Sequence, residues 1–236
     1  MRISSLLPLA AFFAYGNSYK ILVYNVKFGH SHSNFMGRIA DILVEAGHNV
    51  TTLIPIMDES IKDGTTKSRL IHLPVVPEVD EKMKAMMGTD VNFFLSKIID
   101  IPMNFIVGYI FGELFGKTCK NTFETPGLIQ RLRDEKYDVY IAENFDMCLT
   151  HQIGAKANIA VATSILASWQ YDDAGVPLLP SFNPSLYTTH FSAHSILSRA
   201  HNLLGEFLSR VFFGLIRNGV HTVFTDSFGP DFPSFQ

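Results

Sequence analysis

The sequence predicts an α/β fold in which a doubly wound, parallel sheet carries helices on both faces. Residues 21–26 form an apolar run rich in β-branched side chains, which is typical of a strand buried in a parallel sheet. Apolar side chains then recur at helical spacing over residues 36–46, and Gly47 follows as a C-terminal cap. Residues 50–54 begin a second apolar strand. Together these observations indicate a strand–loop–helix–strand unit over residues 20–55, which opens a doubly wound sheet.

The alternation of strands and helices continues along the chain. A polar stretch over residues 58–67 indicates a surface loop, and residues 70–76 predict a third strand that ends at prolines. Thr125 and Pro126 provide an N-cap and a first helical residue. The further elements that we predict are helices within 79–120 and over 125–136, a fourth strand over 137–142, a helix over 147–157, a fifth strand over 159–163, a proline-rich loop over 172–187, a helix over 192–217 and a final strand over 220–224.

The segment 79–120 is unusually rich in methionine and phenylalanine. Polar residues and Pro102 interrupt it too often for a transmembrane helix. Its apolar side chains either pack in the core, line an apolar pocket, or touch a membrane surface. Over residues 91–115 the aromatic density favours a pocket wall or a membrane-facing patch, with Phe94 and Phe111 as the candidate residues.

The amino terminus has the pattern of a secretory signal. Arg2 precedes an apolar run over residues 6–13, and small residues follow it. We expect residues 1–18 to be removed by cleavage between Tyr15 and Tyr19, so that the mature chain enters the secretory pathway. An uncleaved anchor is the alternative, but the run is short for a bilayer span.

Three residues have properties that depend on this compartment. Cys119 and Cys148 would meet oxidising conditions, but two cysteines so far apart in sequence form no framework, and buried free thiols are an equal alternative to a disulfide. Asn49 opens a glycosylation sequon at the predicted turn before the second strand. An unused sequon in a folded turn is the alternative reading there.

Composition and motifs exclude several classes of function. A net charge of −3 gives no electrostatic basis for binding nucleic acid. The first loop has neither the glycine pattern of a dinucleotide site nor that of a phosphate loop, so no cofactor is expected there. Residues 29–33 resemble a nucleophile elbow but carry serine in place of the second glycine. His190 and His194 lack a third ligand at suitable spacing, which favours solvated histidines over a metal site.

Polar residues follow two strands that should be neighbours. His32 lies in a histidine-rich loop after the first strand, and Glu143 and Asp146 follow the fourth. In a doubly wound sheet these strands lie side by side, so both loops flank one crevice. A carboxylate that faces a histidine fixes its tautomer and stabilises the imidazolium formed when a substrate proton is taken. The pattern and the predicted topology together indicate a general base at His32, and a structural histidine in a polar loop is the alternative.

At these residues the sequence resembles the UDP-glycosyltransferase family, in particular the animal glucuronosyltransferases and their nematode members. The resemblance runs from about residue 19 to the end and is most specific over the first strand–helix–strand unit. His32 and His48 are 16 residues apart (48 − 32), the spacing expected between the family's catalytic histidine and its Gly-His turn. The segments that carry the resemblance are Ser31-His32, GRIADIL at 37–43, GHNVT at 47–51, Phe145-Asp146, GVPLLPSFNPS at 175–185 and Arg199-x-x-Asn202.

The resemblance implies that residues 19–236 are the amino-terminal, acceptor-binding half of a two-domain glycosyltransferase of the GT-B type, with a Rossmann-like fold. In that family a histidine deprotonates the acceptor hydroxyl, whose oxygen attacks the anomeric carbon of the sugar with inversion as UDP leaves. His32 matches this base. Glu143 stands where vertebrate relatives have aspartate, and Asp146 is the second candidate for the acidic partner. The candidate acceptor-binding residues are Phe94, Phe111 and Phe145.

The resemblance also implies partners and a location. The UDP-sugar is a co-substrate whose site belongs to a carboxy-terminal half, which a membrane-spanning helix follows; the sequence ends at Gln236 before either. We expect a small lipophilic acceptor, no metal, and the lumen of the endoplasmic reticulum. The alternative is a truncated, non-catalytic module that binds lipophilic ligands or pairs with full-length relatives.

Overall fold

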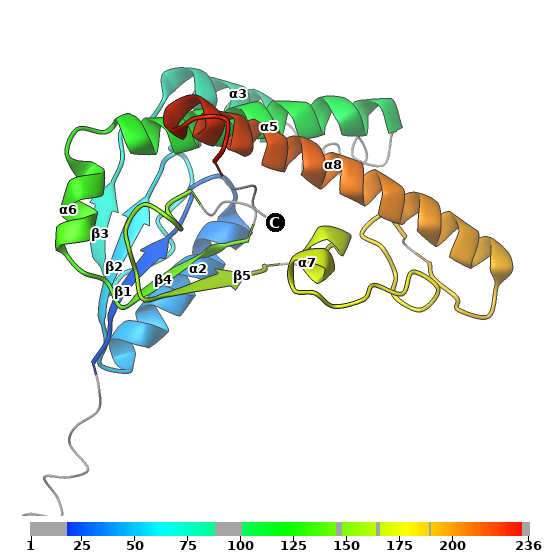
Figure 1. Ribbon diagram of the computed structural model, residues 1–236, viewed down its shortest axis with the longest axis horizontal. Coiled ribbons are helices and arrows are strands. Elements are labelled where there is room, and N and C mark those ends of the chain that lie inside the picture. Colours follow the sequence, from blue (N-terminus) through cyan, green and yellow to red (C-terminus); the bar gives the residue numbers. More distant parts are fainter. Residues whose placement is uncertain (1–17, 88–100, 145–147, 164–165, 189, 233–236) are drawn as a thin grey trace, which may run out of the picture.

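A parallel β-sheet forms the centre of the protein (Figure 1). The computed structural model describes residues 18–87, 101–144, 148–163, 166–188 and 190–232. The sheet has the order β3-β2-β1-β4-β5, so the chain starts in the middle, builds to one side and returns beside β1. This confirms the predicted doubly wound α/β fold. The strands are β1 (Lys20–Tyr24), β2 (Asn49–Ile54), β3 (Arg69–His72), β4 (Val139–Glu143) and β5 (Ala157–Val161).

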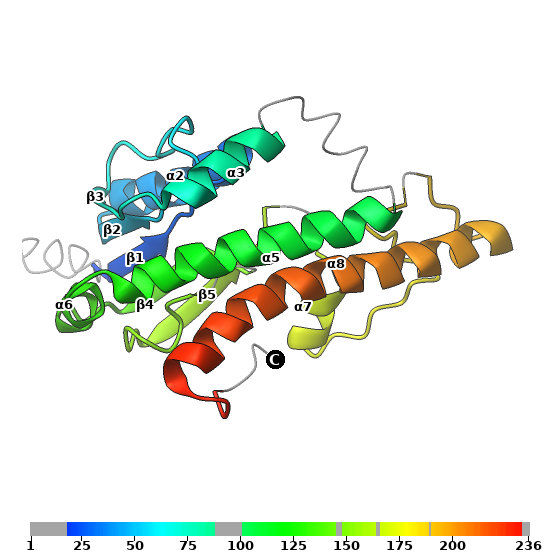
Figure 2. The same cartoon turned by 90° about the horizontal axis from the view of Figure 1, so that it is seen from above.

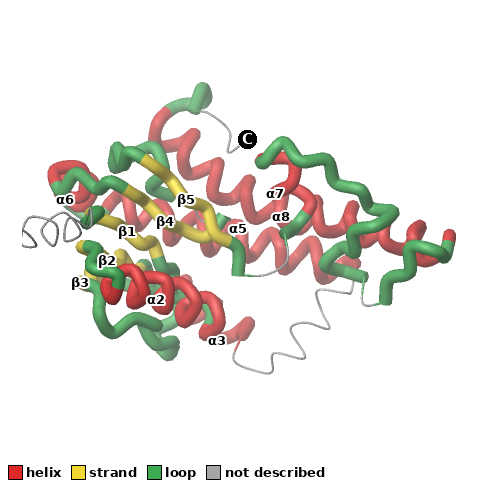
Figure 3. The backbone as a smooth tube through the Cα atoms, turned by 90° about the horizontal axis from the view of Figure 1, so that it is seen from below, coloured by secondary structure: helices red, strands yellow, loops and turns green. Residues whose placement is uncertain are grey.

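Helices cover both faces of the sheet. α2 lies on one face, and α5 and α8 lie side by side across the other (Figures 2 and 3). Successive residues of β1 point to opposite sides. Ile21 and Val23 pack with residues of α2 in a small core, whereas Leu22 and Tyr24 join the main core with residues of α5 and α8. The helices are α2 (His30–Glu45), α3 (Pro77–Met87), α5 (Ile101–Glu124), α6 (Leu128–Asp134), α7 (Ser168–Asp173) and α8 (Ile196–Phe228).

The starts of α2 and α6 differ from the prediction, as does that of α8, which begins at Ile196 instead of residue 192. α2 begins at His30, so the histidine-rich residues 30–34 form its first turns rather than a loop. Gly29 before it is extended and serves as the N-cap. α6 begins at Leu128, because Gly127 takes the left-handed conformation with a φ of 70° and interrupts the helix that we predicted from Pro126. The first of these differences matters for function, since it places His32 on a helix.

Two predicted elements are wrong. Residues 220–224 continue α8 instead of forming a strand, because Val220 and Phe224 repeat the i, i+4 spacing of its buried face. Residues 148–152, where we predicted a helix, form turns. A disulfide holds Cys148, and Gly154 has a positive φ of 66°, and both constraints oppose a continuous helix there.

The described part of the apolar segment 91–115 lies on α5. One face of this helix is buried, and another is exposed to solvent. Phe111 is only 7% exposed and packs with Phe115 in the main core. The expectation that this segment lies outside the core is wrong for Phe111, because a helix laid across a sheet must bury one face. Phe105 and Tyr109 are exposed, so a contact of this side with a membrane surface stays a prediction. In the described parts of the chain, no helix is both long and apolar enough to span a bilayer.

A buried asparagine of α8 holds the proline-rich excursion, which lies alongside the first half of that helix (Figure 1). The side chain of Asn202 accepts a hydrogen bond from the backbone N–H of Ser185 at 2.7 Å. It donates to the carbonyl oxygens of Pro180 at 2.7 Å and Asn183 at 2.8 Å. One side chain thus satisfies three backbone groups in a segment without regular secondary structure.

Glycines bring α5 and α8 into backbone contact. A Cβ atom added at Gly112 would stand 2.5 Å from the carbonyl oxygen of Leu215. A Cβ atom added at Gly219 of α8 would stand 2.3 Å from the carbonyl oxygen of Gly112. The two helices can pack at this separation only because these positions have no side chain.

We therefore expect Gly112→Ala to destabilise the protein by roughly 1–3 kcal/mol, because the new methyl group must push the helices apart. Gly214→Ala is the matched control, since Gly214 lies within α8 but, apart from the neighbouring backbone of that helix, no atom lies within 4 Å of its Cβ position. Alanine should be neutral there or stabilise by up to about 1 kcal/mol. Urea unfolding measures both variants, and equal midpoints would contradict a helix contact that depends on glycine.

Candidate active site

The carboxyl ends of β1 and β4 bring two of the predicted site residues together. The strands pair in parallel, with Tyr24 opposite Ala142. Beyond β1 the chain enters α2, whose first turn carries His32. β4 ends at Glu143. Because parallel strands end at one edge of the sheet, the histidine and the carboxylate lie face to face.

His32 and Glu143 form a close pair. Nδ1 of the histidine lies 2.8 Å from Oε1 and 2.9 Å from Oε2 of the carboxylate. The glutamate side chain is 7% exposed and the histidine side chain 26%, so a buried carboxylate lies beneath a ring that reaches the surface. The ring of Phe28 packs on the imidazole, with 4.4 Å between ring centroids. A carboxylate at Nδ1 favours the tautomer with hydrogen on that nitrogen and the lone pair on Nε2. The arrangement can therefore take a proton at Nε2 and stabilise the cation that results.

A third side chain, which the sequence did not single out, belongs to the same group. Thr163 follows β5, and its hydroxyl donates to Oε1 of Glu143 at 2.7 Å. The hydroxyl oxygen of Thr163 also lies 3.0 Å from Nδ1 of His32. β5 is the neighbour of β4, with Val161 opposite Glu143. The rule that places strand ends at one edge could thus have pointed to the residues after β5.

A second loop fixes the first turn of α2. Asn25, buried just beyond β1, donates side-chain hydrogen bonds to the carbonyl oxygens of Ser33 at 3.2 Å and Asp63 at 3.0 Å. Gly64 has a φ of 75° and lies so close to the backbone of Ser33 that a side chain would collide with it. These contacts hold the turn that carries His32 at a fixed place relative to β1.

Asp41, further along α2, fastens the same loop. Its carboxylate accepts hydrogen bonds from the backbone N–H groups of Thr66 at 3.1 Å and Lys67 at 3.0 Å. Burial raises the pKa of Asp41, but hydrogen bonds from Thr65, Lys67 and Thr66 outweigh it and hold the pKa below its ordinary value. The stability that Asp41 contributes is therefore complete above the ordinary pKa of an aspartate and is lost as pH falls through the lowered pKa.

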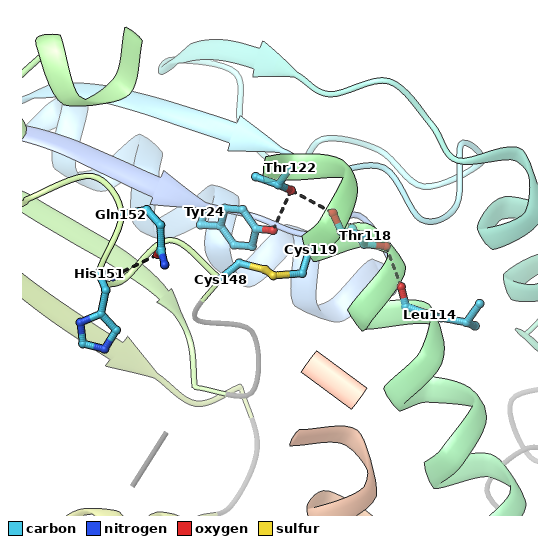
Figure 4. Close-up of a disulfide and its surroundings, with 8 residues drawn as sticks. All are labelled: Tyr24, Leu114, Thr118, Cys119, Thr122, Cys148, His151 and Gln152. Carbon is cyan, nitrogen blue, oxygen red and sulfur yellow. Dashed lines mark hydrogen bonds between the residues drawn. A yellow bond between two sulfur atoms is a disulfide. The ribbon is translucent and has the colours of Figure 1, made fainter. Parts of the chain in front are cut away.

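A disulfide joins α5 to the chain just beyond the pair (Figure 4). Cys119 and Cys148 are fully buried, and their Cα atoms lie 5.8 Å apart. The structure thus decides between the two alternatives that the sequence left open. Cys148 follows Glu143 by five residues (148 − 143), so the bond fixes the chain a short distance beyond the site.

The predicted acceptor-binding residues are placed only in part. Phe111 stacks on Phe115 with 6.1 Å between ring centroids, and Phe115 meets Phe28 edge to face at 5.1 Å. Phe111 is therefore two rings away from the ring that covers His32, and its role in binding an acceptor stays a prediction. The predicted site residues that lie outside the described parts of the chain are Phe94, Phe145 and Asp146.

Three further predictions remain as they were. Asn49 is exposed at the start of β2, and its glycosylation stays a prediction. The proposed signal segment, apart from Ser18, lies outside the described residues. Within those residues, no group of three or more side chains could hold a metal ion.

Fold and site together define a class of protein, a Rossmann-like α/β domain with a histidine–carboxylate pair at the carboxyl edge of its sheet. Comparison with protein families narrows this class. The family model described as "UDP-glucoronosyl and UDP-glucosyl transferase" matches residues 19–231. The chain belongs to this family.

Individual relatives agree with this assignment. The Caenorhabditis elegans protein ugt-47, assigned as a UDP-glucuronosyltransferase, is 29% identical to this chain over 97% of the chain and 43% of its own length. For ugt-46 of the same organism the identity is 26% over 96% of the chain and 43% of the relative. The human UDP-glucuronosyltransferase 3A2 is 28% identical over 69% of the chain and 31% of its own length. The chain thus spans less than half the length of these relatives, which fits the predicted amino-terminal half.

Proposed function

We propose that the protein is the acceptor-binding part of a UDP-sugar-dependent glycosyltransferase and that His32 is its general base. The observation that carries this proposal is the contact of His32 Nδ1 with both oxygens of the buried Glu143. Membership of the family supports the class of reaction. The pair supplies the proton acceptor that transfer of a sugar to a hydroxyl requires.

In the proposed reaction the acceptor O–H gives its proton to Nε2 of His32 while the oxygen forms a bond to the anomeric carbon. The bond between that carbon and the phosphate oxygen of UDP breaks on the opposite face, so the configuration inverts and UDP leaves with the electron pair. Glu143 stabilises the imidazolium through the hydrogen on Nδ1. The imidazolium then returns its proton to solvent before the next turnover.

Three further features of the function are part of this proposal. The donor site belongs to a carboxy-terminal half. The match covers only 43% of the length of ugt-47, so that relative is long enough to contain such a half. The acceptor is small and lipophilic, which the aromatic ring of Phe28 against His32 supports. The protein works in the lumen of the endoplasmic reticulum, where the disulfide would be stable.

A chimera tests this function. Residues 19–236, joined to the carboxy-terminal half of ugt-47, should transfer sugar from UDP-glucose or UDP-glucuronic acid to a phenol, and NMR of the product should show an inverted anomeric centre. The chain by itself should bind the phenol but not UDP in calorimetry, because the donor site is proposed to lie elsewhere. Micromolar affinity for UDP would contradict that placement. Phenol binding without any transfer in the chimera would favour the alternative, a non-catalytic module.

A further inference from the structure

We propose that Thr163 is a positioning residue for the base: it fixes the orientation of Glu143 and, through it, the tautomer of His32. This inference rests on the proposed function. Three oxygens lie within 3.0 Å of Nδ1, namely both carboxylate oxygens at 2.8 and 2.9 Å and the Thr163 hydroxyl at 3.0 Å. They share the single hydrogen that this nitrogen can carry.

The direction of each hydrogen bond follows from counting hydrogens. A carboxylate only accepts, so the hydroxyl hydrogen of Thr163 must point to Oε1 of Glu143, 2.7 Å away. That hydrogen is then committed, and the hydroxyl oxygen can only accept from Nδ1. All three oxygens therefore favour a hydrogen on Nδ1, which leaves the lone pair of the ring on Nε2, where the acceptor proton must go.

A glutamate partner makes such a residue necessary. Its side chain has one more rotatable bond than that of aspartate, so the carboxylate can turn away from the ring at little cost. The hydroxyl of Thr163 removes this freedom by holding Oε1. Two features restrict Thr163 itself. Its β-branched side chain has few rotamers. The backbone N–H of Asn144 donates to the carbonyl oxygen of Val161 at 3.0 Å, and this hydrogen bond joins the ends of β4 and β5.

The substitution Thr163→Val keeps the shape of the side chain and removes the hydroxyl. In the chimera with a carboxy-terminal half it should lower kcat roughly 10- to 100-fold, the effect expected for a lost hydrogen bond to a charged group, while KM for the acceptor changes little. Thr163→Ser keeps the hydroxyl and should restore most of kcat. Thr222→Val makes the same chemical change on the exposed side of α8 and should leave kcat unchanged.

A spectroscopic measurement separates positioning from mere packing. ¹⁵N NMR of histidine-labelled protein, with the His32 signals assigned by comparison with His32→Ala, reports which ring nitrogen carries the hydrogen. Thr163→Val should lower the fraction with hydrogen on Nδ1, and Thr163→Ser should not. An unchanged tautomer signature, or a kcat that stays normal in Thr163→Val, would overturn the inference.

The two proposals can fail independently. If His32 is the base and Thr163 acts through it, Thr163→Val should have no further effect on kcat in the His32→Ala background. The same loss in both backgrounds would show that Thr163 acts by another route and would overturn the inference alone. Normal turnover in His32→Ala would instead overturn the proposed function.

Discussion

Replacement of His32 by alanine should lower turnover of hydroxyl acceptors by roughly 10²- to 10⁴-fold, the range expected for loss of general-base catalysis. The variant is made in the chimera that carries a carboxy-terminal half, because both substrates must bind. Acceptor affinity should change little, since the ring contributes mainly to the transition state, in which the oxygen gives up its proton. Steady-state kinetics with a simple alcohol or phenol measures kcat and KM separately.

His48→Ala is the matched control for this variant. His48 is partly buried in the same strand–helix–strand unit, but it lies at the opposite end of α2, where Nδ1 is 3.4 Å from the backbone nitrogen of Tyr19. Its replacement should leave turnover of the chimera unchanged. Near-normal turnover in His32→Ala would show that another group takes the proton.

Loss of the disulfide should produce the largest change in stability. The bond between Cys119 and Cys148 closes a loop with a sequence separation of 29, and the chain-entropy model gives such a crosslink roughly 3–4 kcal/mol. Both sulfurs are buried in the main core, so replacement by alanine in both positions avoids leaving a buried hydroxyl without a partner. Urea unfolding of the double variant should therefore show a midpoint well below that of the wild type.

The reductant provides the control for this prediction. Dithiothreitol should lower the unfolding midpoint of the wild type toward that of the Cys119→Ala, Cys148→Ala variant and should leave the variant itself unchanged. Because Cys148 follows the site closely in sequence, the affinity for a phenol should also differ between the oxidised and the reduced protein. Two titratable thiols in the unreduced protein, with no response to reductant, would contradict the disulfide.

The part of the fold that the sequence predicted is the part whose signals are local. The periodicities that mark β1, α2 and β2 lie within a few dozen residues, and the strand order follows from the rule for doubly wound sheets. The sequence could predict that His32 and Glu143 lie close together, because each follows a predicted buried strand. The same reasoning points to the residues after β5 but does not single out Thr163 among them, because which of these side chains reaches Glu143 depends on the register of β5 against β4.

The features that the sequence did not settle have a common physical origin. Val220 and Phe224 are β-branched or aromatic residues in a short apolar run, for which strand and helix cannot be told apart by composition, and packing against α5 decides the outcome. Phe111 appeared suited to a pocket wall because aromatic density alone does not reveal which face of a helix meets the sheet. The pairing of Cys119 with Cys148 depends on distance in the folded chain, which two isolated cysteines do not encode.

The central claim is that His32 removes a proton from the acceptor, and the dependence of its effect on the acceptor's own acidity tests this most directly. Wild type and His32→Ala chimeras are compared on an aliphatic alcohol and on a nitrophenol that is already ionised at the assay pH. A base is needed only for the alcohol, so the ratio of wild-type to variant turnover should be roughly 10²–10⁴ for the alcohol and close to one for the nitrophenolate. An equally large loss with both acceptors would contradict the claim, because His32 would then act on something other than the acceptor proton.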